Sequence, residues 1–536
     1  MLEMRSHKFF FGVVLGAYGL YIVTAAVNVP WFDDIDAFVD AFLIFHEAPS
    51  WGAKLAELIA PNNEHRMWLG KTVSIGLTYL MGEMDFRYLI WLQNLVLFGL
   101  VALFHRFHRH HAWTLLWSLF VLTPQYHLSS NWAITGWQHI GVLFMGVLTV
   151  WFLVQPKRWL WALPLMVLTI FTMSNGMLFW AAGIFLLGFQ GKWRELVAWL
   201  FVGIFGIWAY FYGFDTTANS NAFAYFKANP VRSMSSFFVF LGNNGDWFKY
   251  VSLETRSLIA GVWGFVFLGW VLWNGWRLFI HVSPSKFSTG LWALLGVLLF
   301  LLGNGLLIGV LRAQFGYEVM LVGNYRIYSA FFLGSAVLWH VWIQSLLHRS
   351  SHMPVLLGLG IVFWVLSYVI SWPEIKHRQR SLLAAGYNQQ HQGIGLAAQR
   401  GSFLMPYIQE KMEGLQAIDR FTYPTYFPEL LVQRLPMQPA KQDLMFSQDG
   451  PILQHEPIQA AEAIFVVFSR GEERYILPME RIWRQGRWGL PQQDPRYQLI
   501  IPPLFFEKDQ YQVSFLYQKS NNFTPIHSSH SVNITF

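Results

Sequence analysis

Long apolar runs recur through the first two thirds of the chain, and they constrain its fold more than any other sequence feature. A helix of about 20 apolar residues crosses the hydrocarbon core of a bilayer, because each residue advances the helix by about 1.5 Å. We therefore predict a mostly α, polytopic membrane protein with about 11 transmembrane helices. The expected spans are 9–30, 86–104, 112–124, 139–154, 159–173, 177–189, 196–214, 257–276, 288–311, 327–346 and 354–372.

The composition supports this class of protein and excludes others. Charged residues make up 12% of the chain, which is about half of their share in a soluble protein. The chain contains no Cys, so disulfide bonds and thiolate chemistry are excluded. The formal net charge of +7 does not indicate nucleic acid as a partner, because the basic residues follow the loops of a membrane topology.

Lys and Arg are concentrated in alternate loops between the expected spans. The loops 1–8, 105–111, 155–158, 190–195, 277–287 and 347–353 contain 11 Lys or Arg and two Glu. The positive-inside rule places these loops and the N-terminus in the cytoplasm. This pattern, with the absence of Cys, is typical of a protein of the bacterial inner (plasma) membrane, surrounded by membrane lipids.

Two apolar segments differ from the other expected spans. The stretch 67–82 is short and contains Lys71, and a crossing there would move 105–111 to the outer side. We expect a re-entrant or interfacial helix on the outer face instead. The first span resembles the core of a signal peptide, but its length favours retention as a transmembrane helix.

The composition changes at Pro373, beyond which 16 basic and 15 acidic residues nearly balance. We expect a membrane domain at 1–372, with an outer loop at 31–85, and an extracytoplasmic α+β domain at 373–536. Its part 373–440 is expected to be helical with interruptions at Gly386, Gly393 and Gly401, and 441–536 to form a small β-sandwich of about five to seven strands. The expected strands include 463–468, 474–477, 497–501, 511–516 and 532–536.

Three carboxylates follow the first span at the outer membrane surface. Asp33, Asp34 and Asp36 are the candidate catalytic acid–base residues, because paired carboxylates shift one another's pKa. A helix that begins at Asp33 or Asp34 would place Asp33, Asp36 and Asp40 on one face. The alternative is a helix cap with solvated neighbours.

The outer loop continues into a second polar segment. Glu64 and His65 are candidate substrate-binding residues, and Arg66 and Lys71 are candidate ligands of a donor phosphate. Ionisable groups at membrane depth are costly and tend to have a function. The alternative is that Arg66 and Lys71 extend toward lipid headgroups.

The second outer loop combines amide, indole and imidazole groups, which suit the hydroxyls and apolar faces of a sugar. Its candidate substrate-binding residues are Asn131, Trp132, Gln138 and His139. The alternative is the aromatic belt of any membrane protein. The related cluster 174–176 is expected to be a tight turn.

Arg326, preceded by Tyr325, begins a span on the outer side, and both are candidate phosphate ligands. An Arg side chain binds phosphate in a bidentate manner and remains charged. The alternative is again contact with lipid headgroups.

This layout resembles the GT-C superfamily of polytopic glycosyltransferases. The resemblance depends on the segments 33–36, 63–66 and 324–326 and on the C-terminal extracytoplasmic domain. It implies transfer of a sugar from a polyprenyl-phosphate donor to a glycan, lipid or protein acceptor, with Asp33, Asp34 or Asp36 as the acid–base group. The second outer loop lacks the acidic residue that a metal-bridged mechanism would use, so no metal or other cofactor is expected.

Three other functions remain open at this point. A transporter or flippase of lipid-linked saccharide would need ionisable groups near mid-span, whereas the charges of this chain lie at span ends and in loops. A polysaccharide polymerase or ligase shares the architecture and the lipid-linked substrate. A non-catalytic assembly protein would use the β-domain to bind envelope partners.

Overall fold

A computed structural model describes residues 2–62, 65–214, 222–249, 251–427, 445–447, 450–457, 461–485, 491–502, 505–507, 509–520 and 522–534. The chain divides into two compact units. We call Met1–Thr24, Ala48–Val73 and Tyr88–Trp372 the helical unit. Ala25–Glu47, Ser74–Arg87 and Pro373–Phe536 form the sandwich unit, so the acidic segment belongs to the same unit as the C-terminal strands.

The described residues include 8 helices that are long and apolar enough to cross a membrane. They are α1 (Leu2–Ala25), α5 (Phe86–His108), α8 (Ala133–Leu153), α11 (Trp193–Phe211), α14 (Leu253–His281), α15 (Thr289–Leu311), α17 (Arg326–Leu346) and α18 (Met353–Gln392). Each expected span coincides with a helix, but three of these helices are shorter, namely α6 (His111–Val121), α9 (Trp159–Thr172) and α10 (Met177–Phe189). The expected count of about eleven crossings is therefore not confirmed.

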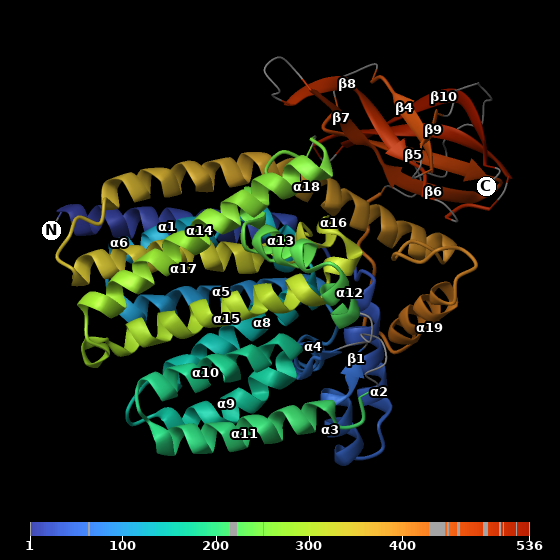
Figure 1. Cartoon of the computed structure of the whole chain (residues 1–536). Coiled ribbons are helices and arrows are strands. Elements are labelled where there is room, and N and C mark those ends of the chain that lie inside the picture. Colours follow the sequence, from blue (N-terminus) through green and yellow to red (C-terminus); the bar gives the residue numbers. More distant parts are fainter. Residues whose placement is uncertain are drawn as a thin grey trace. The chain divides into compact units, whose positions relative to one another are not determined.

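The long helices of the helical unit run side by side (Figure 1). Helix α17 is central, because 94% of its most apolar window is buried, whereas only 22% of the corresponding window of α14 is buried. A helix that is apolar on all sides belongs in a core or in lipid. The exposed Trp273 and Phe265 of α14 are typical of a lipid-facing surface.

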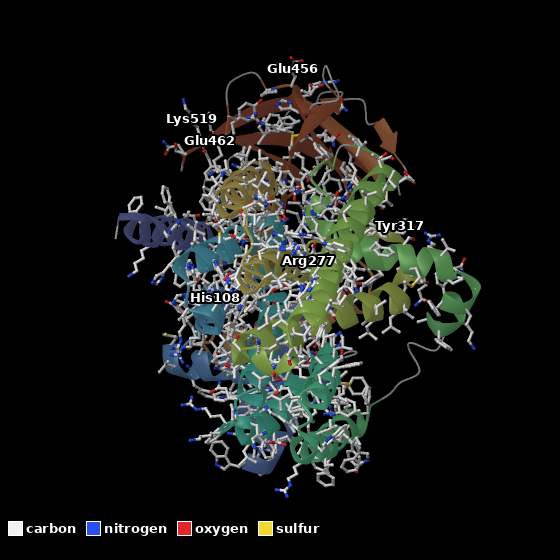
Figure 2. All side chains as sticks on the ribbon, turned by 60° about the vertical axis from the view of Figure 1, so that its left-hand side comes forward. His108, Arg277, Tyr317, Glu456, Glu462 and Lys519 are labelled. Carbon is white, nitrogen blue, oxygen red and sulfur yellow. The ribbon has the colours of Figure 1, made fainter. Side chains whose placement is uncertain are left out.

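The ends of α5 and α14 lie close to the C-terminal part of α17. The ring of His108 is 6.0 Å from that of Trp342, and Arg277 interacts electrostatically with His340. Figure 2 labels His108 and Arg277 at this end of the unit. The structure thus brings the segments after α5 and α14, which the sequence predicts to be cytoplasmic, to one end of the helical unit.

Short elements connect the long helices. They are α3 (Trp51–Ile59), β1 (Pro61–Asn62), β2 (His65–Arg66), α4 (Trp68–Met81), η2 (Pro124–Tyr126), α7 (His127–Ser130), η3 (Ser174–Gly176), α12 (Ala222–Ala228), α13 (Pro230–Leu241), η5 (Asn243–Gly245), η6 (Pro284–Lys286), η7 (Ala313–Phe315) and α16 (Tyr317–Met320). Helix α4 coincides with the stretch expected to be re-entrant or interfacial, and it is shorter than the helices that could cross a membrane.

The sandwich unit includes the helices η1 (Ile35–Asp40), α2 (Ala41–Glu47) and α19 (Leu404–Ala417), and the C-terminal parts of α4 and α18. Helix α18 continues through Gly386, so the expected interruption there is wrong. A Cβ at Gly386 would lie 3.1 Å from the side chain of Val29, so this glycine permits close packing rather than a helix end. The breaks at Gly393 and Gly401 are present, with φ of 67° and 78°.

The strands form two antiparallel four-stranded sheets, with orders β10-β9-β5-β6 and β3-β4-β8-β7. Their bounds are β3 (Met445–Ser447), β4 (Gly450–His455), β5 (Ala463–Arg470), β6 (Glu473–Pro478), β7 (Glu480–Gln485), β8 (Pro491–Ile500), β9 (Asp509–Lys519) and β10 (Asn522–Ile534). A strand lies at each of the five expected ranges, although residues 535–536 of the last range are outside the described residues. With β3, β4 and β7, the described strands of these two sheets number eight, more than the expected five to seven.

The two sheets share one apolar core, as expected for a sandwich. Alternate residues of β5 and β9 enter this core, including Val466, Phe468, Val513 and Phe515. From the other sheet, the ring of His455 stacks on Phe515 at a centroid distance of 3.8 Å. The alternation of apolar residues in the sequence was therefore sufficient to predict β5 and β9.

Candidate functional site

The acidic segment of the sandwich unit begins with an unusual backbone. Phe32 has φ of 45°, a conformation that is costly for an aromatic residue. The buried Asp34 accepts a hydrogen bond from the backbone N–H of Trp31 at 2.9 Å, and the following residues Ile35–Asp40 form a π-helix. Strained residues and π-helical turns are often found at functional sites.

Asp36 and Asp40, two of the three carboxylates predicted to share a helix face, both bind α19. The hydroxyl of Tyr407 is 3.2 Å from Asp36 and 3.1 Å from Asp40. The ammonium group of Lys411 is 3.2 Å from Asp40. These contacts join the acidic segment to a helix more than 360 residues later in the chain, and the sequence contained no sign that Tyr407 or Lys411 would take part.

Asp33 differs from its neighbours. No described residue forms a hydrogen bond or ion pair with its carboxyl group, which is partly buried. Burial raises the pKa of Asp33, and the negative charge of Asp36 raises it further. Among the three candidate catalytic residues, Asp33 is therefore the one whose carboxyl group forms no hydrogen bond or ion pair with the described residues. Asp34 has the geometry of a turn residue.

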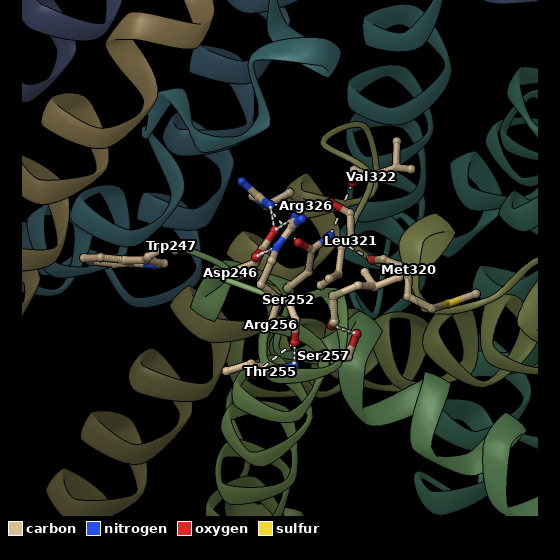
Figure 3. Close-up of polar contacts among 12 residues, drawn as sticks. Asp246, Trp247, Ser252, Thr255, Arg256, Ser257, Met320, Leu321, Val322 and Arg326 are labelled. Atoms are coloured by element: carbon tan, nitrogen blue, oxygen red, sulfur yellow. Dashed lines mark hydrogen bonds and ion pairs between the residues drawn. The ribbon is translucent and has the colours of Figure 1, made fainter. Parts of the chain in front are cut away.

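Arg326 is part of a buried ion-pair network in the helical unit (Figure 3). Its guanidinium group donates to Asp246 at 2.9 Å and to the side-chain oxygen of Asn243 at 3.0 Å. Arg256 binds the same carboxylate through two hydrogen bonds of 2.8 Å. The side chains of Arg326 and Asp246 are 5% and 0% exposed, so this network joins the beginnings of α17 and α14.

The two arginines determine the charge state of Asp246. Burial alone would raise the pKa of Asp246, but the hydrogen bonds from Arg256 and the charges of Arg326 and Arg256 lower it below its usual range. Asp246 is therefore ionised at neutral pH.

Lys71 and Arg66, the other two predicted phosphate ligands, have different surroundings. Lys71 forms an ion pair with Glu57 at 2.7 Å and joins α3 to α4, with 2% of its side chain exposed. Arg66 donates to the backbone oxygens of Ile59, Tyr210 and Tyr212. No carboxylate of the described residues pairs with Arg66, so its charge is not neutralised within the described part of the chain.

The rings of Phe171, Tyr210 and Phe214 surround the guanidinium group of Arg66, with centroids 5.8 to 5.9 Å away. Such cation–π contacts stabilise a positive charge without cancelling it. Burial lowers the pKa of Arg66, whereas the nearby Tyr210 raises it. Arginine remains protonated under these conditions because its usual pKa is far above 7.

The turn η3 provides polar side chains that contact His65 on one side and Tyr328 and Asn304 on the other. Ser174 lies 3.1 Å from the Nδ1 atom of His65. Asn175 donates to the hydroxyl of Tyr328 at 2.8 Å and to the side-chain oxygen of Asn304 at 3.1 Å. The segment 174–176 thus forms the expected turn, and its polar side chains also extend the predicted sugar-binding cluster into the core.

His139 joins the same cluster. Its Nδ1 atom is 2.9 Å from the hydroxyl of Tyr328, and its ring lies 6.0 Å from that of Tyr325. The structure therefore brings His65, His139 and Tyr325 together with the unpredicted Asn175, Tyr328 and Asn304. A single Asn in the apolar run of α15 was the sequence signal for Asn304, because an amide inside a membrane helix is costly.

The other residues of the second outer loop bind neighbouring helices. Asn131 donates to the hydroxyl of Tyr21 in α1, and Gln138 donates to the sulfur of Met67 at 3.3 Å. Trp132 precedes α8 and is partly exposed. Ser129 binds the backbone oxygen of Asn324 at 2.8 Å, so the second outer loop and the segment before α17 lie side by side.

The predicted site residues therefore fall into two groups. Asp33, Asp34 and Asp36 belong to the sandwich unit, whereas Arg66, His65, His139, Tyr325 and Arg326 belong to the helical unit. Glu64 and its neighbour Asn63 lie outside the described residues. Within the described part of the chain, no group of three or more His, Asp or Glu has the geometry of a metal site.

No family model, no curated protein and no solved structure matches this chain.

Proposed function

We propose that the chain is an integral membrane glycosyltransferase. It moves a sugar from a polyprenyl-phosphate donor to an envelope glycan, lipid or protein acceptor on the outer side of the membrane. The observation that carries the proposal is the carboxyl group of Asp33, which has a raised pKa and no partner among the described residues. A general base requires such a group, because a carboxylate already bound to a cation is a weaker proton acceptor.

In the proposed reaction, Asp33 accepts the proton of an acceptor hydroxyl while the hydroxyl oxygen attacks the anomeric carbon. The bond between that carbon and the phosphate oxygen breaks, and the phosphate leaves with the electron pair. This displacement inverts the anomeric configuration. A positioned base of this kind contributes about 10²- to 10⁴-fold to the rate.

A donor phosphate needs a cation. Within the helical unit, Arg66 is the strongest candidate of the three predicted phosphate ligands, because Lys71 and Arg326 are already paired with Glu57 and Asp246. Its guanidinium group uses three of five N–H groups in hydrogen bonds to carbonyl oxygens. The apolar surface of the helical unit suits the lipid chain of the donor.

The direct test compares Asp33→Asn with Asp34→Asn and Asp36→Asn in a transfer assay with a synthetic polyprenyl-phosphate sugar. We expect Asp33→Asn to lower turnover by about 10² or more, because the amide cannot accept the proton. Asp419→Asn is the matched control, since Asp419 is exposed and Asn tolerates its φ of 54°. Near-parental transfer by Asp33→Asn at normal expression would contradict the assignment of the base.

A transporter or flippase of the same lipid-linked saccharide is the main alternative. The buried polar groups between α8, α15 and α17 are neutral amide, hydroxyl and imidazole groups rather than the ionic pairs common in ion-coupled transport. Release of free polyprenyl phosphate in detergent, where no transport is possible, separates the two functions. A polymerase or ligase would also release the carrier, and the length of the product distinguishes it.

A further inference from the structure

The sandwich unit contains a polar cavity between the end of α18 and α19. Its volume is about 400 Å³, within the range of small-ligand sites. Five of the ten lining residues are glutamines. They are Gln389, Gln390, Gln392, Gln409 and Gln416.

Tyr423 lines the cavity with a hydroxyl group that has no partner. Its side chain is 5% exposed, and the oxygen forms no hydrogen bond with any described residue. Burial raises the pKa of Tyr423, so the hydroxyl stays protonated and can donate. A buried hydroxyl without a partner costs roughly 1–3 kcal/mol, which a bound ligand would offset by supplying the missing hydrogen bond.

The glutamines leave further hydrogen-bonding capacity. Gln409 donates to Glu413 at 2.8 Å, and Gln389 accepts a long hydrogen bond from the backbone of Leu396 at 3.4 Å. The side chains of Gln392 and Gln416 form no hydrogen bond with the described residues. An amide offers two donors and one acceptor oxygen, and a sugar hydroxyl both donates and accepts.

The charge of the lining does not favour an anionic ligand. Its described residues include no Lys or Arg, His391 is the one residue that can become cationic, and Glu413 is the one carboxylate. A phosphate or carboxylate ligand would need a cation at this position. A neutral saccharide meets the amide groups, the hydroxyl of Tyr423 and a carboxylate acceptor without a charge penalty.

We propose that this cavity binds a neutral saccharide at a site separate from the acidic segment. Gln409, Glu413 and Gln416 leave α19 on the side opposite to Tyr407 and Lys411, because residues three to four apart share a helix face. The two sites are therefore about one helix diameter apart. As a subsite for the acceptor glycan the cavity depends on the proposed transferase function, whereas its affinity for saccharide does not.

The test measures saccharide binding to the full-length protein by saturation-transfer NMR, with no donor present. The protein is purified in dodecylphosphocholine, because maltoside and glucoside detergents carry sugar headgroups. The probes are maltose, cellobiose and N,N′-diacetylchitobiose, with glucose 1-phosphate as the charged comparison. We expect at least one neutral disaccharide to bind more tightly than glucose 1-phosphate.

Two variants locate the binding. Tyr423→Phe removes a hydroxyl that has no partner in the described chain, so we expect at least 5-fold weaker binding without a lower melting temperature. Gln416→Ala removes an exposed amide of the cavity and should weaken binding by at least 3-fold. Gln399→Ala, which is exposed and outside the lining, is the matched control and should bind normally.

Three results would overturn the inference. They are no signal from any neutral disaccharide, unchanged affinity in both cavity variants, and tighter binding of glucose 1-phosphate than of the neutral sugars. Loss of sugar transfer by Asp33→Asn with normal disaccharide binding would support both proposals. Binding without transfer by the parent protein would contradict the transferase function and leave the saccharide site supported.

Discussion

A terminal nitrogen of Arg326 lies 2.9 Å from a carboxylate oxygen of Asp246, and both side chains are buried. The sequence places Arg326 at the outer end of a span, where it was expected to bind phosphate. In the structure its guanidinium group forms an ion pair with Asp246 and also donates a hydrogen bond to Asn243. The pair thus has a structural role at the beginning of α17.

Arg326→Ala should destabilise the protein, because it removes three buried hydrogen bonds and one of the two arginines that bind Asp246. We expect a loss of about 2–3 kcal/mol, since Arg256 still compensates the carboxylate. Arg326→Lys should restore less than half of the stability that Arg326→Ala loses, because an ammonium group cannot reproduce the directed hydrogen bonds of a guanidinium group. Thermal unfolding in detergent measures the stability of both variants, with Arg349→Ala, at an exposed position, as the control.

Stability should depend on Asp246 in a defined direction of pH. Its pKa is lowered in the folded protein, so its stabilising contribution is present above the usual Asp value of 3.8 and disappears as the pH falls through the lowered pKa. The melting temperatures of the parent and Asp246→Asn should therefore differ at pH 6 and converge as the pH falls below the lowered pKa of Asp246. A constant difference down to pH 2 would contradict the ion-pair assignment.

Asp33→Asn should not destabilise the protein and should raise its melting temperature slightly. The pKa of Asp33 is raised by burial and by Asp36, so ionisation of this carboxyl at neutral pH opposes folding. Removal of the charge relieves that cost, as is common at catalytic positions. The gain should vanish at pH values below 3.8, where the parent carboxyl is also protonated. A lower melting temperature at pH 7 would indicate a structural role.

The raised pKa of Asp33 also affects the pH profile of transfer. A base must be deprotonated, so the acidic limb of kcat/KM should have its midpoint above the usual Asp value of 3.8. Asp36→Asn removes the repulsive neighbour and should move this midpoint to lower pH. An unchanged midpoint in Asp36→Asn would assign the limb to another group.

The membrane orientation is open to cysteine labelling, because the parent chain contains no Cys. We expect His110→Cys, exposed after α5, to react with an impermeant maleimide only after the membrane is permeabilised. Gln399→Cys, exposed between α18 and α19, should react in intact cells or spheroplasts. Reaction of His110→Cys from outside would reverse the predicted topology.

The helices and strands were predictable where periodicity and length were decisive. Every expected span coincides with a helix, because a run of apolar residues has few other stable conformations in a membrane. Gly386 does not end its helix, because glycine can either break a helix or permit close packing, and only the position of Val29 distinguishes the two. The short strand β3 and the edge strand β7 carry too little alternation to be recognised alone.

The site was less predictable than the fold. The acidic residues were visible because carboxylates are scarce in this chain. The sequence does not show which of them is the base, because only the structure shows that Tyr407 binds Asp36 and that Asp33 has no partner among the described residues. Asp246 has no sequence signal, because a single carboxylate in a loop forms no pattern, whereas the amide of Asn304 within an apolar helix is such a signal.

The sequence by itself determined that the chain has long apolar helices followed by a strand-rich region, since hydrophobicity and periodicity are properties of neighbouring residues. Only the tertiary structure decided which charges remain uncompensated. Pairing depends on groups that are distant in the chain, such as Asp40 with Lys411 and Arg326 with Asp246. A charge without a counter-ion is costly in a folded protein. The described groups that have none, such as the carboxyl group of Asp33 and the guanidinium group of Arg66, can therefore be recognised only after the chain has folded.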